Sequence, residues 1–461
     1  MTTPLLSSPQ HDPRDNHQHK MGLAGGQTAE KERGVTQFDA SVFQNEYLPE
    51  GGDVVDAVVS VTAVEGGAQP ETHEPIIEVI AVDVSGSMNE DGGAKIRAAR
   101  TATQVAIDTL NDGVLFAVIA GNHEAKMLYP PHGQLVESTA KTRAEARDAA
   151  SRIHADGGTA IGSWLRGAAQ LIQGHNDSVA HVILLTDGRN EHEEVWQLDA
   201  AIAQSVGLFE CDCRGLGVNW EPDELRKISN ALLGTTDIIA NPSEMEAEFQ
   251  ALTQKTMAKQ VTNVALRLWT PKGSEIEFVR QVSPNLDELS DKAVEVDALS
   301  SDYPLGSWAD GESRDYHVRV KIPTGTIGDE RLAARVMLAV NGEAEPVALV
   351  RAVWTNDDAL STRINREVAH YTGQAELADA IATGLAARQS GDEKEATMKL
   401  GRAVQIAHEA GNEGTVRLLQ KVVEVEDPKT GTVRLKRGVE AADEMALDVR
   451  STRTVRVQRE N

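Results

Sequence analysis

The chain has 461 residues, of which 40% are hydrophobic and 25% charged, and its formal net charge is −26. At roughly 150 residues per domain, this length predicts about three domains. The excess of 71 acidic over 45 basic residues argues against nucleic acid or an anionic membrane surface as the main partner, because both require a basic face.

The two cysteines, Cys211 and Cys213, are too few for a disulfide framework. The sequence contains no apolar stretch long enough for a signal peptide or a membrane span. We therefore expect a cytoplasmic protein.

The first 64 residues fall into two parts. Residues 1–40 are mostly polar and predict a disordered tail. Residues 43–64 are strand-like, with a β-branched segment over residues 54–62. Because no strand-like partner precedes this segment, we expect it to pair with strands much later in the chain.

Residues 74–259 alternate short apolar runs with amphipathic helical patterns. The expected strands cover residues 76–83, 114–120, 179–186 and 208–216, and the expected helices include residues 95–110, 161–172 and 242–259. This alternation predicts an α/β domain, an open and mostly parallel sheet with helices on both faces.

Three further segments complete the predicted organisation. Residues 260–355 contain alternating and β-branched runs separated by Pro-Gly turns, which indicates a β-sandwich. Residues 356–449 are helical in pattern, and the basic, polar residues 450–461 predict a loose tail.

Polar side chains with metal-binding chemistry follow the strands of the α/β segment. Asp83, Ser85 and Ser87 come directly after the first of these strands. Thr159 stands in a Gly-Gly-Thr loop before a helix, and Asp187 follows a later strand. Because open α/β sheets bind ligands at the carboxyl ends of their strands, we expect the five side chains to meet there.

This set of side chains suits a divalent cation. Mg²⁺ prefers six oxygen ligands and retains several waters. The two carboxylates balance the charge of one divalent ion, and the three hydroxyls add oxygen without adding charge. We expect Mg²⁺, with Mn²⁺ or Ca²⁺ as alternatives, and a coordination position that a partner's carboxylate can fill.

The order Asp-x-Ser-x-Ser, then Thr, then Asp resembles the metal-ion-dependent adhesion site of von Willebrand factor type A domains. The resemblance covers about two-fifths of the chain, residues 74–259. It implies a mostly parallel sheet with one antiparallel edge strand. It also implies that Ser85 and Ser87 bind the metal directly, that Thr159 and the two aspartates bind it directly or through water, and that the site binds proteins and does not catalyse a reaction.

Motifs of several enzyme classes are missing from the sequence. There is no phosphate-binding GxxxxGK[ST] loop, no HExxH zinc motif and no GxSxG elbow. A hydrolase that uses the metal would need a general base beside a bound water, for which Asp83 and His192 are the candidates. We expect both to have coordinating or surface roles, so we do not expect an enzyme.

We predict an adaptor whose metal ion binds an acidic side chain of another protein. Such an adaptor would act in intracellular signalling or complex assembly. Trp196 and Trp220 are near the same edge of the sheet and are candidate anchors for that partner, with core packing as the alternative. The domain layout is similar to that of bacterial cytoplasmic signalling proteins. A cofactor subunit of a MoxR- or chelatase-like AAA+ ATPase and a metal-dependent hydrolase stay open as alternative functions.

Overall fold

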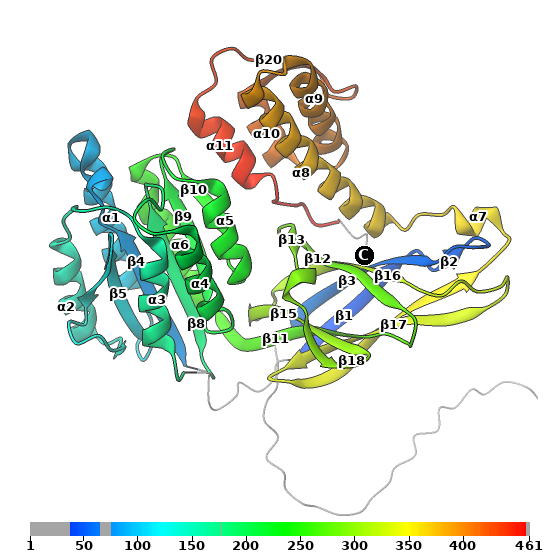
Figure 1. The fold of residues 1–461 in the computed structure, drawn as a ribbon, viewed down its shortest axis with the longest axis horizontal. Helices are drawn as coiled ribbons and strands as arrows, with labels where there is room; N and C mark the ends of the chain where they lie inside the picture. The colour runs from blue at the N-terminus through cyan, green and yellow to red at the C-terminus, as the bar shows by residue number, and fades with distance from the viewer. Residues whose placement is uncertain (1–36, 65–74, 176, 458–461) are drawn as a thin grey trace, which may run out of the picture.

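The computed structural model describes residues 37–64, 75–175 and 177–457, which form an α/β unit, a two-sheet β unit and a C-terminal helical unit (Figure 1). Most of the tail expected over residues 1–40 therefore lies outside the described residues, as do residues 458–461. None of the helices in the described ranges is long and apolar enough to cross a membrane.

Seven strands make the sheet of the α/β unit, in the order β10-β9-β8-β4-β5-β6, with β7 also paired to β5. Their bounds are β4 (Ile76–Asp83), β5 (Leu115–Gly121), β6 (Ala125–Tyr129), β7 (Val136–Glu137), β8 (Val179–Thr186), β9 (Glu210–Leu216) and β10 (Thr236–Ile239). Strands β4, β5, β8, β9 and β10 are parallel, whereas β6 and β7 are antiparallel to β5. The predicted fold class is confirmed.

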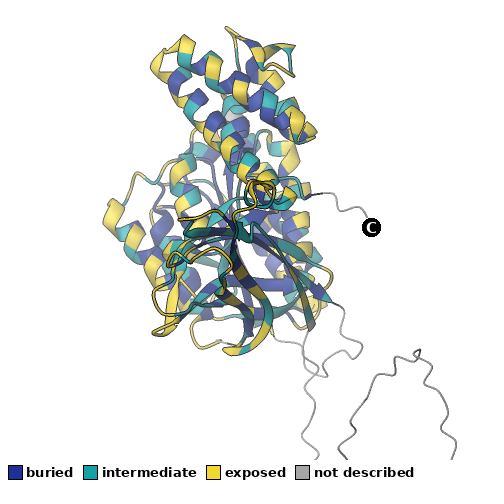
Figure 2. Cartoon of the chain, turned by 90° about the vertical axis from the view of Figure 1, so that its right-hand side faces the viewer, coloured by how far each residue is buried: buried dark blue, intermediate teal, exposed yellow. Residues whose placement is uncertain are grey.

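Helices cover both faces of this sheet, and Figure 2 shows the buried strands between more exposed helices. One face packs against α1 (Glu90–Thr109), α2 (Ala140–Ser151) and α6 (Met245–Met257), and the other against α3 (Ile161–Ile172), α4 (Val195–Ser205) and α5 (Pro222–Ala231). Short 3-10 turns precede α1 (η1, Gly86–Asn89) and α6 (η2, Pro242–Glu244). The first turn of α1 contains Gly92 and Gly93 with φ of 65° and 75°, a conformation that favours glycine.

The β unit contains two sheets, β1-β3-β16-β12-β13 and β14-β15-β11-β17-β18-β2. The strands of the first sheet are β1 (Gln37–Gln44), β3 (Val54–Val64), β12 (Glu275–Ser283), β13 (Asp287–Glu288) and β16 (Ser313–Lys321). Those of the second are β2 (Tyr47–Leu48), β11 (Lys259–Trp269), β14 (Val294–Asp297), β15 (Ser300–Ala309), β17 (Glu330–Val340) and β18 (Glu343–Trp354), with a 3-10 turn η3 (Ser290–Lys292) before β14. Apolar side chains from both sheets share one core.

Strand β3 lies between β1 and β16 and is antiparallel to both. Its pairing with β16, about 250 residues further along the chain, places this N-terminal segment in the β unit. The pairing with β1 corrects the expectation that no strand precedes it and that residues 37–40 belong to a disordered tail. Half-buried Phe38, Ala40 and Val42 alternate along β1 and pack against the shared core.

The C-terminal unit contains α7 (Asp358–Ser361), α8 (Arg366–Ser390), α9 (Glu393–Glu409), α10 (Glu413–Val422) and α11 (Ala441–Arg450). A hairpin of β19 (Val423–Asp427) and β20 (Thr432–Leu435) interrupts the helices, which the purely helical prediction for residues 356–449 did not include. Helix α11 contributes Ala446 and Val449 to the core of the α/β unit.

The chain after α11 is held in place as far as residue 457, which corrects the expectation of a loose tail over these residues. Arg450 forms an ion pair with Asp237 of the α/β unit at 2.8 Å, and Arg453 binds the same carboxylate. Arg456 pairs with the buried Asp315 of the β unit at 3.0 Å. The basic residues of the C-terminus therefore connect the α/β and β units.

A buried ionic cluster ties α6 to the sheet near the amino ends of the strands. His181 on β8 places Nδ1 2.9 Å from Glu78 Oε1 and Nε2 3.2 Å from Asp212 Oδ2. The Thr256 hydroxyl of α6 lies 3.0 Å from the same Nδ1. Burial alone would lower the pKa of His181, but the charges of Glu78 and Asp212 outweigh burial and raise it to about 10.

This cluster predicts how stability depends on pH. A histidine whose pKa is raised on folding stabilises the protein fully below its unfolded pKa of about 6.5, and that contribution is lost as the pH rises towards 10. The unfolding free energy should therefore fall more steeply between pH 7 and 10 in the wild type than in His181→Gln. Urea denaturation at a series of pH values measures both slopes, and equal slopes would show that His181 is not charged in the folded protein.

Candidate metal site

The two aspartates of the predicted site meet at the carboxyl edge of the sheet. Asp83 is the last residue of β4, and Asp187 directly follows β8, the parallel neighbour of β4. Both side chains are fully buried. Asp83 Oδ1 accepts a hydrogen bond from the Ser85 backbone N–H at 2.7 Å, and Asp83 Oδ2 accepts one from the Thr186 hydroxyl at 2.6 Å.

The two serines continue this network from the turn after β4. The hydroxyls of Ser85 and Ser87 lie 2.9 Å apart, and the Ser87 hydroxyl donates to Asp187 Oδ1 at 2.6 Å. The turn itself is fixed because the Gly86 N–H donates to the Gly157 carbonyl at 2.8 Å. Ser85 is buried, whereas Ser87 is partly exposed, so the network reaches the surface at Ser87.

Thr159 lies near the same point, on a loop that is clamped by hydrogen bonds to the segment between β8 and α4. The backbone N–H of Thr159 donates to His192 Nδ1 at 3.2 Å, and the N–H of His192 donates back to the Thr159 carbonyl at 3.0 Å. Asn190 and Glu193 accept hydrogen bonds from the first N–H groups of α3. Glu193, which precedes α4 in the chain, therefore places its carboxylate at the start of α3.

Lys95 of α1 completes the site. Its Nζ donates to Asp187 Oδ2 at 2.6 Å, and its side chain is only 10% exposed. The position of Lys95 is visible in the sequence, because Lys95, Ala99, Ala102 and Ala106 follow helical spacing and all four are buried. A cation on the apolar face of a helix indicates a buried anionic partner, so Lys95 was identifiable from the sequence although it was not predicted.

Burial, hydrogen bonds and neighbouring charges shift the pKa values of Asp83 and Lys95. Burial raises the pKa of Asp83 to about 6, with the hydrogen bonds from Ser85 and Thr186 opposing the shift. Burial alone would lower the pKa of Lys95, but the hydrogen bond and the charge of Asp187 outweigh it and raise that pKa. The raised pKa keeps the Lys95 side chain in its ammonium form at neutral pH.

The donor set fits a hard divalent cation. Two carboxylates and three hydroxyls, all oxygen donors, are of the type that Mg²⁺, Mn²⁺ and Ca²⁺ prefer. The Thr159 hydroxyl makes no hydrogen bond within the described part of the chain. A Cβ at Gly188 would lie 3.5 Å from Thr159 Oγ1 and 3.6 Å from Ser87 Oγ, so both hydroxyls border one small space. The described ranges hold no separate group of three or more His, Cys, Asp or Glu side chains suited to a metal.

The two tryptophans have different environments. Trp196 is 67% exposed and Val195 69% exposed, at the start of α4 and just after the segment that clamps Thr159. Trp220 is only 1% exposed, and its ring packs so closely on Gly215 that a Cβ there would overlap it. Trp220 is therefore a core residue, which corrects its assignment as a candidate partner anchor.

Both candidates for a hydrolytic base are held by hydrogen bonds within the protein. Asp83 has no exposed surface, and both of its carboxylate oxygens accept hydrogen bonds within the protein. His192 uses Nδ1 to accept the N–H of Thr159. The positions of both side chains are therefore fixed by the protein's own hydrogen bonds.

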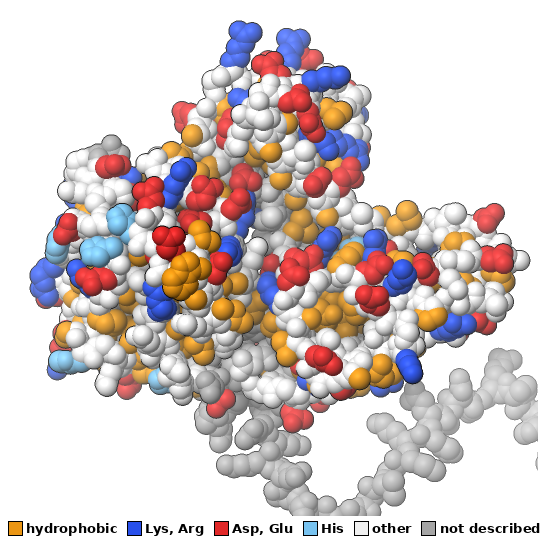
Figure 3. Space-filling model, viewed as in Figure 1, with side chains coloured by type: hydrophobic (Ala, Val, Ile, Leu, Met, Phe, Trp, Pro, Cys, Tyr) orange, Lys and Arg blue, Asp and Glu red, His pale blue; other side chains and the backbone are white. Residues whose placement is uncertain are grey.

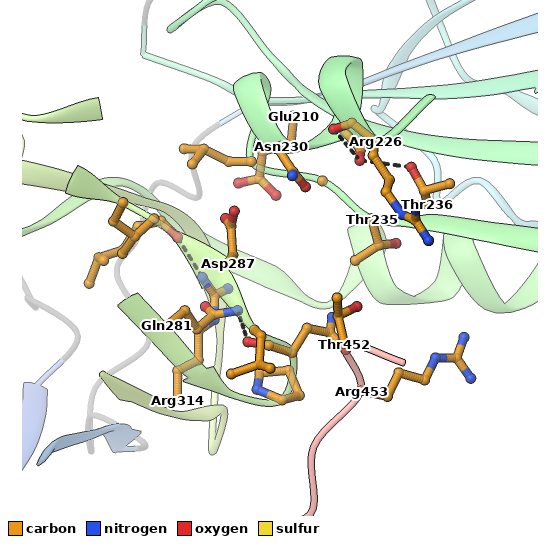
Figure 4. Close-up of a pocket in the computed structure, with 18 of the residues that line it drawn as sticks. Glu210, Arg226, Asn230, Thr235, Thr236, Gln281, Asp287, Arg314, Thr452 and Arg453 are labelled. Carbon is orange, nitrogen blue, oxygen red and sulfur yellow. Dashed lines mark hydrogen bonds between the residues drawn. The ribbon is translucent and has the colours of Figure 1, made fainter. Parts of the chain in front are cut away.

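The larger hollows of the described chain lie elsewhere, where the α/β and β units meet. One has a volume of about 720 Å³, with Leu208 and Val264 in its lining. The other, of about 210 Å³, is drawn in Figure 4, where Glu210 and Asp287 approach from opposite units and Arg453 from the C-terminal segment. Neither contains a residue of the carboxyl edge described above.

Two family models match this chain. The model of the von Willebrand factor type A domain matches residues 78–238, which include all five predicted metal ligands. The model of the von Willebrand factor type A C-terminal domain matches residues 405–451, from within α9 to just after α11.

Two solved structures extend the similarity to nearly the whole chain. A von Willebrand factor type A protein from Catenulispora acidiphila is 48% identical with a TM-score of 0.87, over 93% of this chain and 99% of that one. The ArnB paralog VWA2 from Sulfolobus acidocaldarius is 16% identical with a TM-score of 0.55, over 91% and 98% of the two chains. At that identity, the second similarity shows the fold alone.

Curated relatives match over shorter segments. The protein sll0103 of Synechocystis sp. is 28% identical over 252 residues, which are 54% of this chain and 58% of that protein. Inter-alpha-trypsin inhibitor heavy chain H4 of Sus scrofa is 30% identical over 174 residues, 33% of this chain and 18% of the relative. The chain thus spans less than two thirds of the length of these relatives.

The clamp on Thr159 can be tested at Gly158. A Cβ at this position would lie 2.0 Å from the His192 ring, so Gly158→Ala must displace either the ring or the Thr159 loop. We expect Mg²⁺ affinity, measured by calorimetry, to fall about ten- to a hundredfold, as when a group that orients a ligand is lost. Gly86→Ala is the matched control, because its Cβ would meet only the Gly157 carbonyl at 3.5 Å. Equal affinities in both variants would show that the clamp does not position Thr159.

Proposed function

Because the chain belongs to the von Willebrand factor type A family, whose members generally mediate protein interactions, we propose that it is a metal-dependent protein-binding adaptor. Asp83, Ser85, Ser87, Thr159 and Asp187 would hold one divalent ion, for which Mg²⁺ is the first candidate. The observation that carries this proposal is the convergence of two buried carboxylates and three hydroxyls at one edge of the sheet.

When bound, the ion supplies a Lewis-acidic position for a carboxylate oxygen of a protein partner. The chain's own residues hold that position still. Ser87 and Asp187 are connected by a 2.6 Å hydrogen bond, and the loop of Thr159 is clamped on both sides of its peptide by His192. A preformed site of this kind binds with little loss of conformational entropy, which favours capture of an exposed Asp or Glu.

The surface beside the site offers an apolar contact to the same partner. Val195 and Trp196 are both more than 60% exposed and follow His192 by three and four residues. Figure 3 shows a small group of hydrophobic side chains among acidic ones over α4. Exposed tryptophans are frequent anchors of protein interfaces, so we propose that the partner presents an apolar side chain near its acidic residue.

Partner capture with the full chain as bait tests this function. Proteins retained in Mg²⁺ and released by EDTA, and identified by mass spectrometry, are the expected result for the wild type. The variant Ser85→Ala with Ser87→Ala should lose them without unfolding, because it removes two hydroxyls at a strand end. Trp196→Ala should weaken binding of a captured partner roughly tenfold in a direct binding assay.

The matched control removes two exposed hydroxyls on α1 and α2, as Thr101→Ala with Ser151→Ala, and should retain the partner. A partner that binds equally well in EDTA, or to the double serine variant, would contradict a metal-dependent contact at this edge.

A further inference from the structure

The ion pair between Lys95 and Asp187 places a permanent positive charge inside the proposed metal site. The two groups are 2.6 Å apart, with the Asp187 side chain fully buried and that of Lys95 10% exposed. Glu90 also approaches Lys95 at 3.5 Å, but its side chain is 59% exposed and therefore well solvated. Asp187 is thus the anion that Lys95 neutralises within the protein.

The net charge of the site depends on this lysine. Asp83, Asp187 and Lys95 carry charges of −1, −1 and +1, which sum to −1. A divalent ion changes the sum to +1, and an incoming carboxylate returns it to zero. Without Lys95 the corresponding sums are −2, zero and −1.

A net charge in a buried site is costly, so the state with a sum near zero is favoured. With Lys95 present, that state contains both the metal and an acidic ligand. Without Lys95, it contains the metal alone.

We propose that Lys95 is a tethered counterion that weakens binding of the metal alone and makes metal and acidic ligand bind cooperatively. The proposal rests on the proposed function, since it concerns the same site. In the absence of metal, the ammonium group compensates Asp187 and keeps the site folded. When the metal is bound, the charge of Lys95 leaves the site with a net charge of +1, which an anionic ligand neutralises.

Mn²⁺ titrations of the full chain test this coupling, in chloride and in acetate at equal ionic strength and pH 7.5. Acetate serves as a simple carboxylate probe. For the wild type we expect tighter Mn²⁺ binding in acetate than in chloride. Lys95→Gln and Lys95→Met should bind Mn²⁺ in chloride roughly ten- to a hundredfold more tightly, because one nearby positive charge is gone. In both variants the gain from acetate should disappear.

Thermal unfolding in EDTA gives a readout that does not depend on the metal. Lys95→Met should unfold at a lower temperature than the wild type, because Asp187 is left buried without a counterion. Adding Asp187→Asn to Lys95→Met should restore part of the loss. Lys141→Met, which removes a lysine 84% exposed on the same unit, is the matched control and should match the wild type in both experiments.

The outcomes separate the two proposals. A wild type that binds no Mn²⁺ would contradict the proposed function, while the EDTA measurements would still test whether Lys95 compensates Asp187. A wild type that binds Mn²⁺, together with Lys95 variants of unchanged Mn²⁺ affinity and unchanged acetate effect, would overturn the counterion proposal alone. Unchanged stability of Lys95→Met in EDTA would also overturn it.

Discussion

Two carboxylates that are both fully buried at the ends of adjacent parallel strands need positive charge and hydrogen-bond donors around them. Asp83 and Asp187 obtain both from their surroundings, through a backbone N–H, the hydroxyls of Thr186 and Ser87, and the ammonium of Lys95. Burying like charges is costly unless they are compensated. The local structure of the edge, including its glycines and the clamped Thr159 loop, follows from this requirement.

The rest of the molecule fixes this edge in space without covering it. The α/β unit is inserted between β3 and β11, which belong to the two sheets of the β unit, so the chain crosses between the units twice. The cluster around His181 holds α6 near the amino ends of the strands, opposite the carboxyl edge that contains Asp83 and Asp187. The C-terminal arginines add further ion pairs to both units. In Figure 1, α1 begins at the upper left, away from the β unit, and Ser87, just before α1, is partly exposed.

Sequence patterns predicted those parts of the fold that depend on local periodicity. The apolar runs of β4 and β8 are buried along almost their whole length, as expected for central parallel strands, and the order of the polar residues after them pointed to one shared edge. The partner of Lys95 was not predictable in this way, because it lies 92 residues away in the chain. The sequence also did not predict which tryptophan is buried. Trp196 and Trp220 both follow strand ends, but Trp220 is buried with its ring packed against Gly215.

Short or mixed segments were the harder part of the fold. Residues 37–40 of β1 were assigned to the polar tail because the alternating apolar residues there are few and lie next to a long polar region. The β19–β20 hairpin follows α10 without a break, so its period-two pattern begins inside what was interpreted as a helical segment. In both cases tertiary pairing, with β3 or within the hairpin, decides the structure more than local preference does.

Calorimetric titration of the metal-free full chain with Mg²⁺, compared with Asp187→Ala under the same conditions, tests the central claim most directly. We predict one Mg²⁺ per wild-type chain and no measurable binding to the variant, because Asp187 supplies one of only two carboxylates in the site. Absence of binding to the wild type, or equal binding to Asp187→Ala, would contradict the assignment of this edge as a metal site.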